Sequence, residues 1–264
     1  MLKTNYYYLV AGLPDLLLDK KNQVFSGMEF RQELQAQLDK SDYNLARLLF
    51  LEYDNQHLLD IHFGEVEPGY NRDALLLNPF SYIPKYFEWA DKQKEPYQKL
   101  AFENKLNTLY YSYLLKCNNE FLKKWFLFKL NLKNILATVN CLKYNFEIEK
   151  HLVQVTENRE LTALLLKKNI EPKNFDDLLP MSREIFAVIN SSDPVLETEL
   201  KLDQIIWDYV DDETCYNYFS IEKILAFIIK LMLVERWNKL DEEKGQEMIN
   251  QLIADVREDY KDAE

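Results

Sequence analysis

Glycine is the residue whose scarcity says most, because the 264-residue chain has only five glycines and eight prolines. Sheets and α/β folds use glycine in hairpin turns, bulges and phosphate-binding loops, whereas helical proteins need it mainly at helix ends. Neither residue occurs between Tyr97 and Glu171, and from Val195 onward only Gly245 interrupts the chain. Hydrophobic residues make up 47% of the sequence, enough for a substantial core. The composition therefore predicts an all-α fold of roughly eight to ten helices with little or no sheet.

Other absences exclude whole classes of function. Neither glycine-rich phosphate-binding pattern, GxxxxGK or GxGxxG, occurs, so a nucleotide site of that kind is excluded. Aspartate and glutamate (44) outnumber lysine and arginine (32), and the net charge of −12 argues against nucleic acid and anionic lipid as partners. The three cysteines, Cys117, Cys141 and Cys215, include no CxxC pair, which is typical of reduced thiols in a cytoplasmic protein.

Apolar runs in the chain are short. The longest, residues 221–234, is interrupted by two lysines and falls short of the roughly 20 residues that cross a bilayer. Near the start, NYYYLVAGLPDL (residues 5–16) has three tyrosines and three apolar residues before Gly12, whereas a secretory signal needs an apolar run of about seven or more. We therefore expect no export signal, and we expect the three tyrosines to pack into the first helical bundle with hydroxyl partners.

Histidine offers the only pattern that resembles a metal site. His57 and His62 flank Asp60, but ligands five positions apart point about 140° apart on a helix and to opposite faces of a strand. His151 could act as a base for Cys141, yet no local motif supports a nucleophile there. The sequence thus predicts no catalytic, cofactor-binding or metal-binding residue. A helical metal-dependent hydrolase that uses these histidines is the least favoured alternative.

Helical spacing and capping signals divide the chain into elements. A Ser26–Glu29 capping box precedes the first long helix, Pro96 suits a helix start, and Ser182, Asp193 and Ser220 are predicted caps. The predicted helices are residues 30–38, 43–53, 100–114, 121–139, 147–155, 159–168, 182–189, 194–209, 221–240 and 244–260. Residues 58–63 are predicted to be extended or helical. The 121–139 helix is apolar over more than half its circumference, which predicts packing on several sides.

The segment 64–96 contains most of the glycine and proline and is predicted to be irregular. We therefore expect an N-terminal helical lobe over residues 1–95 and helical bundles over 96–264. Within the irregular segment, the aromatic cluster from Tyr82 to Trp89 is interpreted as core packing, with a partner interface as the alternative.

Two apolar stretches align with each other and share a pattern. They are WFLFKLNLKNILATVNCLKYNFE (residues 125–147) and YFSIEKILAFIIKLMLVERWNKLDEEKGQEMINQLI (residues 218–253). Both resemble the repeated helical unit of the V-type ATPase C-subunit family, called d subunits in eukaryotes, with degenerate copies at about residues 97–170 and 195–260. The matching positions are Lys133 and Asn134 in the first stretch, and Leu225, Ala226, Phe227 and Arg236 in the second, where Trp237 replaces the family's asparagine. YYYLVAGLPDL also resembles the opening of a bacterial family encoded beside V-type ATPase genes.

The resemblance implies a non-catalytic part of a rotary ATPase, without cofactor or small-molecule substrate. Related helical bundles would surround a concave surface and couple the central-stalk subunits to the membrane proteolipid ring. The chain would then be cytoplasmic and peripheral to the inner face of the cell membrane only through the complex. Lys133 and Arg236 would tie helices together through carboxylates or carbonyls. The alternative is an unrelated all-α cytoplasmic scaffold that holds a basic partner on its acidic surface.

Overall fold

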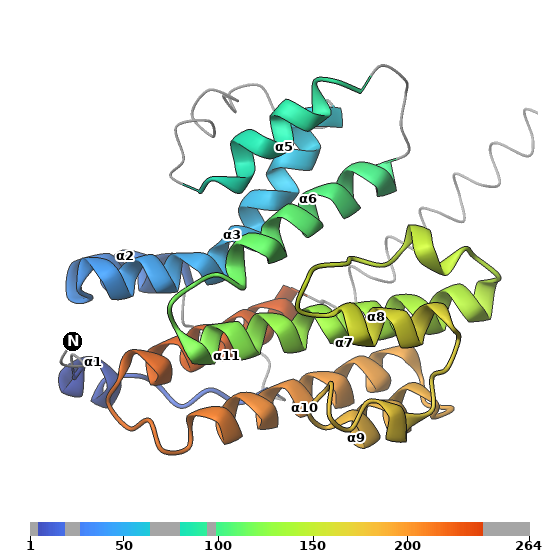
Figure 1. The fold of residues 1–264 in the computed structure, drawn as a ribbon. Coiled ribbons are helices and arrows are strands. Elements are labelled where there is room, and N and C mark those ends of the chain that lie inside the picture. The colour runs from blue at the N-terminus through green and yellow to red at the C-terminus, as the bar shows by residue number, and fades with distance from the viewer. Residues whose placement is uncertain (1–4, 19–26, 64–79, 94–98, 240–264) are drawn as a thin grey trace, which may run out of the picture. The chain divides into compact units, whose positions relative to one another are not determined.

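The computed structural model describes residues 5–18, 27–63, 80–93 and 99–239 (Figure 1). Every regular element in these ranges is helical, which confirms the predicted all-α fold. The α-helices are α1 (Tyr7–Ala11), α2 (Gly27–Gln37), α3 (Lys40–Phe63), α5 (Tyr82–Ala90), α6 (Lys99–Leu114), α7 (Glu120–Tyr144), α8 (Arg159–Leu166), α9 (Ser182–Ile189), α10 (Val195–Thr214) and α11 (Ile221–Lys239), with 3₁₀ turns η1 (Ile148–Lys150) and η2 (Pro172–Asn174). None of these helices has the length and apolar composition that a membrane crossing requires.

The described residues form two compact units. The first combines the described parts of residues 1–43 and 217–264, and the second comprises those of 44–216. The predicted boundary near residue 95 does not coincide with this division, because α5 and α6, on either side of it, pack against each other in the second unit. The second predicted repeat copy, residues 195–260, is also divided, with α10 in the second unit and α11 in the first.

In the first unit, α2 packs against α11. Phe30 of α2 meets Phe227 of α11 edge to face, with ring centroids 5.1 Å apart. The backbone N–H of Gly27 donates to Glu235 Oε1 at 2.9 Å, so a carboxylate of α11 satisfies a free donor at the positive end of α2. A Cβ at position 27 would lie 2.6 Å from that oxygen, so a larger residue there would displace the Glu235 carboxylate.

Of the three N-terminal tyrosines, only Tyr6 lies in the core. Its hydroxyl donates to Asp42 Oδ2 at 2.6 Å and accepts from the backbone N–H of Asp39 at 3.3 Å. Tyr7 and Tyr8 are 54% and 96% exposed. The expectation that all three tyrosines pack inside is therefore wrong for these two, because the short helix α1 buries only one of its faces.

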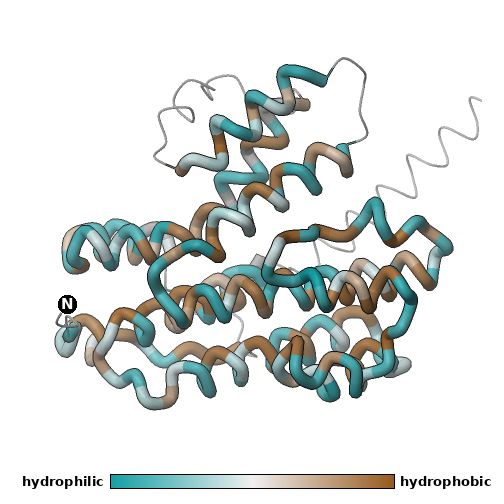
Figure 2. The backbone as a smooth tube through the Cα atoms, in the orientation of Figure 1, coloured by the Kyte–Doolittle hydropathy of each residue, from teal (hydrophilic) through white to brown (hydrophobic). Residues whose placement is uncertain are grey.

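In the second unit, α7 is the central helix. It packs against α6, α8, η1 and α10, and its buried residues occupy more than one face, as the sequence predicted. Figure 2 shows apolar positions recurring along α7 and α10. The Phe128 ring stacks on Tyr209 of α10 with centroids 4.1 Å apart. Asn119 Oδ1 caps the first turn by accepting the Leu122 N–H at 2.9 Å. The helix ends at Tyr144, and the next residue, Asn145, has a left-handed φ of 58°, which asparagine tolerates well.

The prediction that residues 80–93 are irregular is wrong, because α5 is a helix. Its proline, Pro84, lies in the first turn, where backbone N–H groups have no partner within the helix and proline is tolerated. Tyr82, Ile83 and Phe87 are all buried, so the aromatic cluster forms core in this unit and not an exposed partner surface.

The predicted helix over residues 147–155 is reduced to the single turn η1. The backbone groups of Val153 are bonded to side-chain amides of Asn134 and Asn158 instead of to the backbone of a helix. Side-chain amides of this kind compete directly with helical hydrogen bonds, and here they hold an extended strap, residues 152–155, on α7.

The side chains of two predicted helix caps, Ser182 and Asp193, bond to other side chains instead of capping a helix. Ser182 is the first residue of α9, and its hydroxyl donates to Asp176 Oδ1 at 2.8 Å. Pro194 precedes the first residue of α10, and Asp193 pairs with Lys201 at 2.7 Å. Residues 43–53 and 58–63, predicted separately, belong to the continuous helix α3. Ser26, Pro96 and the predicted helix 244–260 lie outside the described residues.

Replacing Tyr6 by phenylalanine removes a hydroxyl that makes two hydrogen bonds at a buried position. We expect a loss of about 1–2 kcal/mol in the free energy of unfolding, because the partners lose a neighbour that water cannot fully replace. The matched control Tyr8→Phe, at a 96% exposed position, should change it by less than about 0.5 kcal/mol. Urea denaturation followed by circular dichroism measures both, and equal effects of the two variants would contradict this account of the N-terminus.

Candidate functional site

The six positions singled out by the family resemblance lie on two helices. Lys133 and Asn134 are on α7 in the second unit, and Leu225, Ala226, Phe227 and Arg236 are on α11 in the first. Both helices are long and apolar, so the resembling stretches occupy core elements of their units.

Asn134 is fully buried and organises the residues around it. Its Nδ2 donates to the carbonyl of Val153 at 2.8 Å, and its Oδ1 accepts the Val153 N–H at 3.0 Å. Asn158 Nδ2 donates to the same carbonyl at 3.0 Å, and Asn158 Oδ1 accepts the Val155 N–H at 2.9 Å. The two amides therefore replace the ladder of a regular element and fix the strap against α7.

Lys133 lies one position before Asn134 and points away from that network. Its Nζ is 3.5 Å from Glu103 Oε1 of α6, and the two side chains are 41% and 44% exposed. The pair joins two helices, as the resemblance implied for this lysine, but an ion pair so exposed contributes little stability.

On α11, Leu225, Ala226 and Phe227 are all buried in the first unit. The Arg236 guanidinium carbon lies 5.9 Å from the centroid of the Trp237 ring. Trp237 stands where the V-type ATPase C-subunit repeat, which this stretch resembles, has asparagine. Its aromatic face contacts the neighbouring Arg236 cation.

The histidines and thiols are dispersed. His57 and His62 are on α3, and the His151 ring stacks on Phe146 with centroids 5.8 Å apart. Within the described ranges no group of three His, Cys, Asp or Glu residues is placed to hold a metal ion. Burial raises the pKa of the Cys117 and Cys141 thiols, which disfavours the thiolate that a cysteine nucleophile needs.

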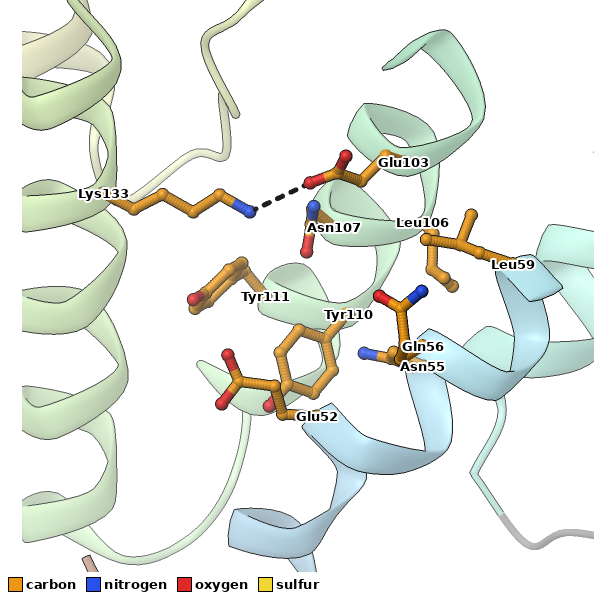
Figure 3. Close-up of a pocket in the computed structure, with 10 residues that line it drawn as sticks. All are labelled: Glu52, Asn55, Gln56, Leu59, Glu103, Leu106, Asn107, Tyr110, Tyr111 and Lys133. Carbon is orange, nitrogen blue, oxygen red and sulfur yellow. Dashed lines mark ion pairs between the residues drawn. The ribbon is translucent and has the colours of Figure 1, made fainter. Parts of the chain in front are cut away.

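The second unit contains a polar cavity of about 140 Å³ between α3, α6 and α7 (Figure 3). Its polar lining includes Glu52 and Gln56 of α3, Glu103 and Asn107 of α6, and Lys133 of α7. Tyr110 and Tyr111 of α6 also line it, although these residues are only 5% and 3% exposed. No sequence pattern signals this cavity, because its side chains come from three helices and match no motif.

The carboxylates of the cavity already have lysine neighbours from α7. Lys129 Nζ donates to Glu52, and Lys133 pairs with Glu103. Two amides of the lining are also engaged, since Asn55 Oδ1 accepts the Tyr82 hydroxyl at 2.7 Å and Gln56 Nε2 donates to Asp60 at 2.8 Å. The Tyr110 and Tyr111 hydroxyls bond to no described residue, and they are not among the fully buried polar atoms that lack a partner, so both face the cavity.

Burial raises the pKa of several phenols in the second unit. It raises the pKa of Tyr86 to about 12. Burial is the main cause, and nearby carboxylates add to it, in raising the pKa of Tyr110 and Tyr209 well above the usual range. For Tyr111, burial followed by the negative charge of Glu52 also raises the pKa. The phenols at the cavity are thus neutral hydrogen-bonding groups at physiological pH.

Comparison with protein families gives a match over almost the whole chain. A family model described as "Protein of unknown function (DUF2764)" matches residues 3–260. No curated protein and no solved structure matches the chain.

Replacing Asn134 by leucine keeps its approximate size but leaves the Val153 N–H without a partner in the core. We expect this to lower the free energy of unfolding by about 2–4 kcal/mol, the cost of buried unsatisfied groups. The matched control is Asn140→Leu on the exposed side of the same helix, which should change stability by less than about 0.5 kcal/mol. Urea midpoints of both variants test this, and a stable Asn134→Leu protein would show that the strap is held by other contacts.

The raised pKa of the buried tyrosines leads us to expect a loss of stability at high pH. Their pKa is raised in the folded state, so the stabilisation is complete below the unfolded value of about 10 and is lost as the pH rises above it. We expect the urea midpoint to fall above about pH 10, with phenolate absorbance rising further when the protein unfolds. Tyr209→Phe keeps the ring that stacks on Phe128 and should make that fall shallower. A urea midpoint that is unchanged at alkaline pH would show that the pKa of these phenols is not raised by folding.

Proposed function

We propose, for a chain that belongs to the family described as "Protein of unknown function (DUF2764)", a non-catalytic role as an adaptor in a V-type rotary ATPase. In this role it couples the central-stalk subunits to the membrane proteolipid ring. It is cytoplasmic and reaches the inner face of the cell membrane only through the complex. Its bundles would surround a concave surface that receives the stalk.

One observation carries the proposal. The two stretches that resemble the repeat of the V-type ATPase C-subunit family coincide with α7 and the described part of α11, the helices with the most extensive apolar burial in their respective units. Of these positions, Lys133 also makes a contact of the kind that the resemblance implies, its pair with Glu103 between α7 and α6.

The mechanical task also suits the structure. An adaptor that passes torque must deform little under load, and close-packed interiors transmit strain with little compliance. The core of the second unit contains many aromatic rings, including the stacked pair Phe128 and Tyr209 and the tilted pair Phe175 and Phe186. Fixed polar contacts such as those of Asn134 add directional restraint inside this packing.

An acidic interaction scaffold is the second candidate, and the surface of α10 favours it. Glu197, Asp208 and Asp212 of this helix are exposed and lie on one side of it, within about 60° around its axis. A face of this charge would attract a basic partner segment through long-range electrostatics, and its binding would weaken with salt.

Deletion of the gene tests the adaptor role directly. We expect membranes from the deletion strain to lose ATP-driven ion pumping, because torque no longer reaches the ring. A tagged chain should also co-purify with stalk and ring subunits. Re-expression of the wild-type chain should restore pumping. The variant Asn140→Leu, at an exposed position, should restore it equally well. Undiminished pumping in the deletion strain, with no ATPase component recovered on the tagged chain, would reject the adaptor role. Recovery of a basic protein instead, in a salt-sensitive manner, would favour the scaffold.

A further inference from the structure

The polar cavity between α3, α6 and α7 contains hydrogen-bonding groups that the described residues do not use. Tyr110 and Tyr111 are more than nine-tenths buried, yet no described residue bonds to either hydroxyl. Buried polar groups nearly always have a partner, from the protein or from a molecule bound beside it. In Figure 3, Tyr111 projects from α6 between the Lys133 side chain and the Glu52 carboxylate. The two phenol oxygens are open to the cavity, where a ligand would replace water beside them.

The described lining contains two carboxylates and one ammonium group. Glu52 and Glu103 are both lining residues, and the Glu103 carboxylate has more lone pairs than Lys133 can use. Gln56 uses its amide nitrogen for Asp60, which leaves its oxygen toward the lining. Lys133 is the one cation of the described lining, and at 3.5 Å from Glu103 it is loosely held. With two carboxylates to one ammonium group, the lining suits a positively charged ligand that donates hydrogen bonds, which describes a primary ammonium group.

The volume of the cavity and its apolar lining limit the size and class of the ligand further. A cavity of about 150 Å³ holds benzene, with six non-hydrogen atoms, so the cavity of about 140 Å³ fits a chain of similar size. Leu59 and Leu106 supply apolar lining for methylene groups. The ring faces of Tyr110 and Tyr111 can also attract a cation.

We propose that this cavity binds a primary alkylammonium group, with Glu52 and Glu103 as its counter-charges and the hydroxyls of Tyr110 and Tyr111 as neutral acceptors. Lys133 acts as an internal competitor, because its own ammonium occupies Glu103 when the site is empty. Two sources supply this chemistry, a free diamine or the lysine side chain of a partner protein. The inference does not depend on the ATPase role.

Titration calorimetry with 1,4-diaminobutane and with N-acetyl-lysine methylamide tests the proposal on the full chain. We expect saturable binding to one site at millimolar concentrations. Tyr111→Phe should weaken it about fivefold by removing one acceptor, and Glu103→Gln at least about tenfold by removing a charge. Tyr144→Phe and Glu160→Gln, both at exposed positions, are the matched controls and should leave affinity unchanged. If the diamine binds more tightly than the lysine analogue, the ligand is a free diamine, and the reverse order supports a partner's lysine.

Two further measurements separate the site from a general loss of structure. Lys133→Ala should strengthen binding several-fold, because the internal competitor is gone, and a damaged fold could not produce that gain. Tetramethylammonium has the charge but no N–H donor, and it should bind at least about tenfold more weakly. Absence of saturable binding by both amines, equal binding of tetramethylammonium, or weaker binding by Lys133→Ala would overturn the proposal.

Discussion

The larger unit depends on one polar side chain held inside an apolar helix. An unsatisfied amide at the buried Asn134 would cost about 1–3 kcal/mol, so the helix can be central only if something supplies both a donor and an acceptor. The backbone of Val153 supplies both, and Asn158 completes the arrangement from the start of α8. The need of the Asn134 amide for hydrogen-bond partners thus determines where the chain runs after α7 ends. Apolar packing alone would allow the strap many positions, whereas two directed hydrogen bonds allow one.

Around this core, α7 reaches its neighbours through lysines on its exposed sides. Lys124, Lys129 and Lys133 pair with carboxylates of α10, α3 and α6 respectively. Each pair is too exposed to stabilise the fold much. Their effect is better described as orientation, since a misplaced helix would bring these carboxylates together without a counter-charge in a chain whose net charge is −12. Packing of the aromatic rings therefore stabilises the unit, and the ion pairs of the α7 lysines restrict how its helices are arranged.

Periodicity and composition predicted most of the fold, and the failures have identifiable causes. The apolar spacing of α6, α7, α9 and α11 is local information, and these helices lie where it predicted. The 147–155 helix was lost to side-chain amides that include one more than ten residues away, which no local window contains. The division into units rests on contacts such as that of Gly27 with Glu235, between opposite ends of the sequence. The cavity was unpredictable for the same reason, because its phenols and carboxylates become neighbours only when three helices assemble.

A stiff body and a polar cavity are not in conflict. An empty cavity forfeits dispersion contacts along its walls, so a protein selected only for stiffness would be expected to fill this space with larger apolar side chains. At Tyr110 and Tyr111 the chain instead has aromatic rings that pack well and hydroxyls that end in the cavity without a partner among the described residues. A bound ammonium would donate to those hydroxyl oxygens and bridge carboxylates on α3 and α6. It would thereby add restraint between two helices that α7 otherwise ties through single lysines. Occupancy of the cavity would then raise the rigidity of this unit, which links a small ligand to a mechanical property of the fold.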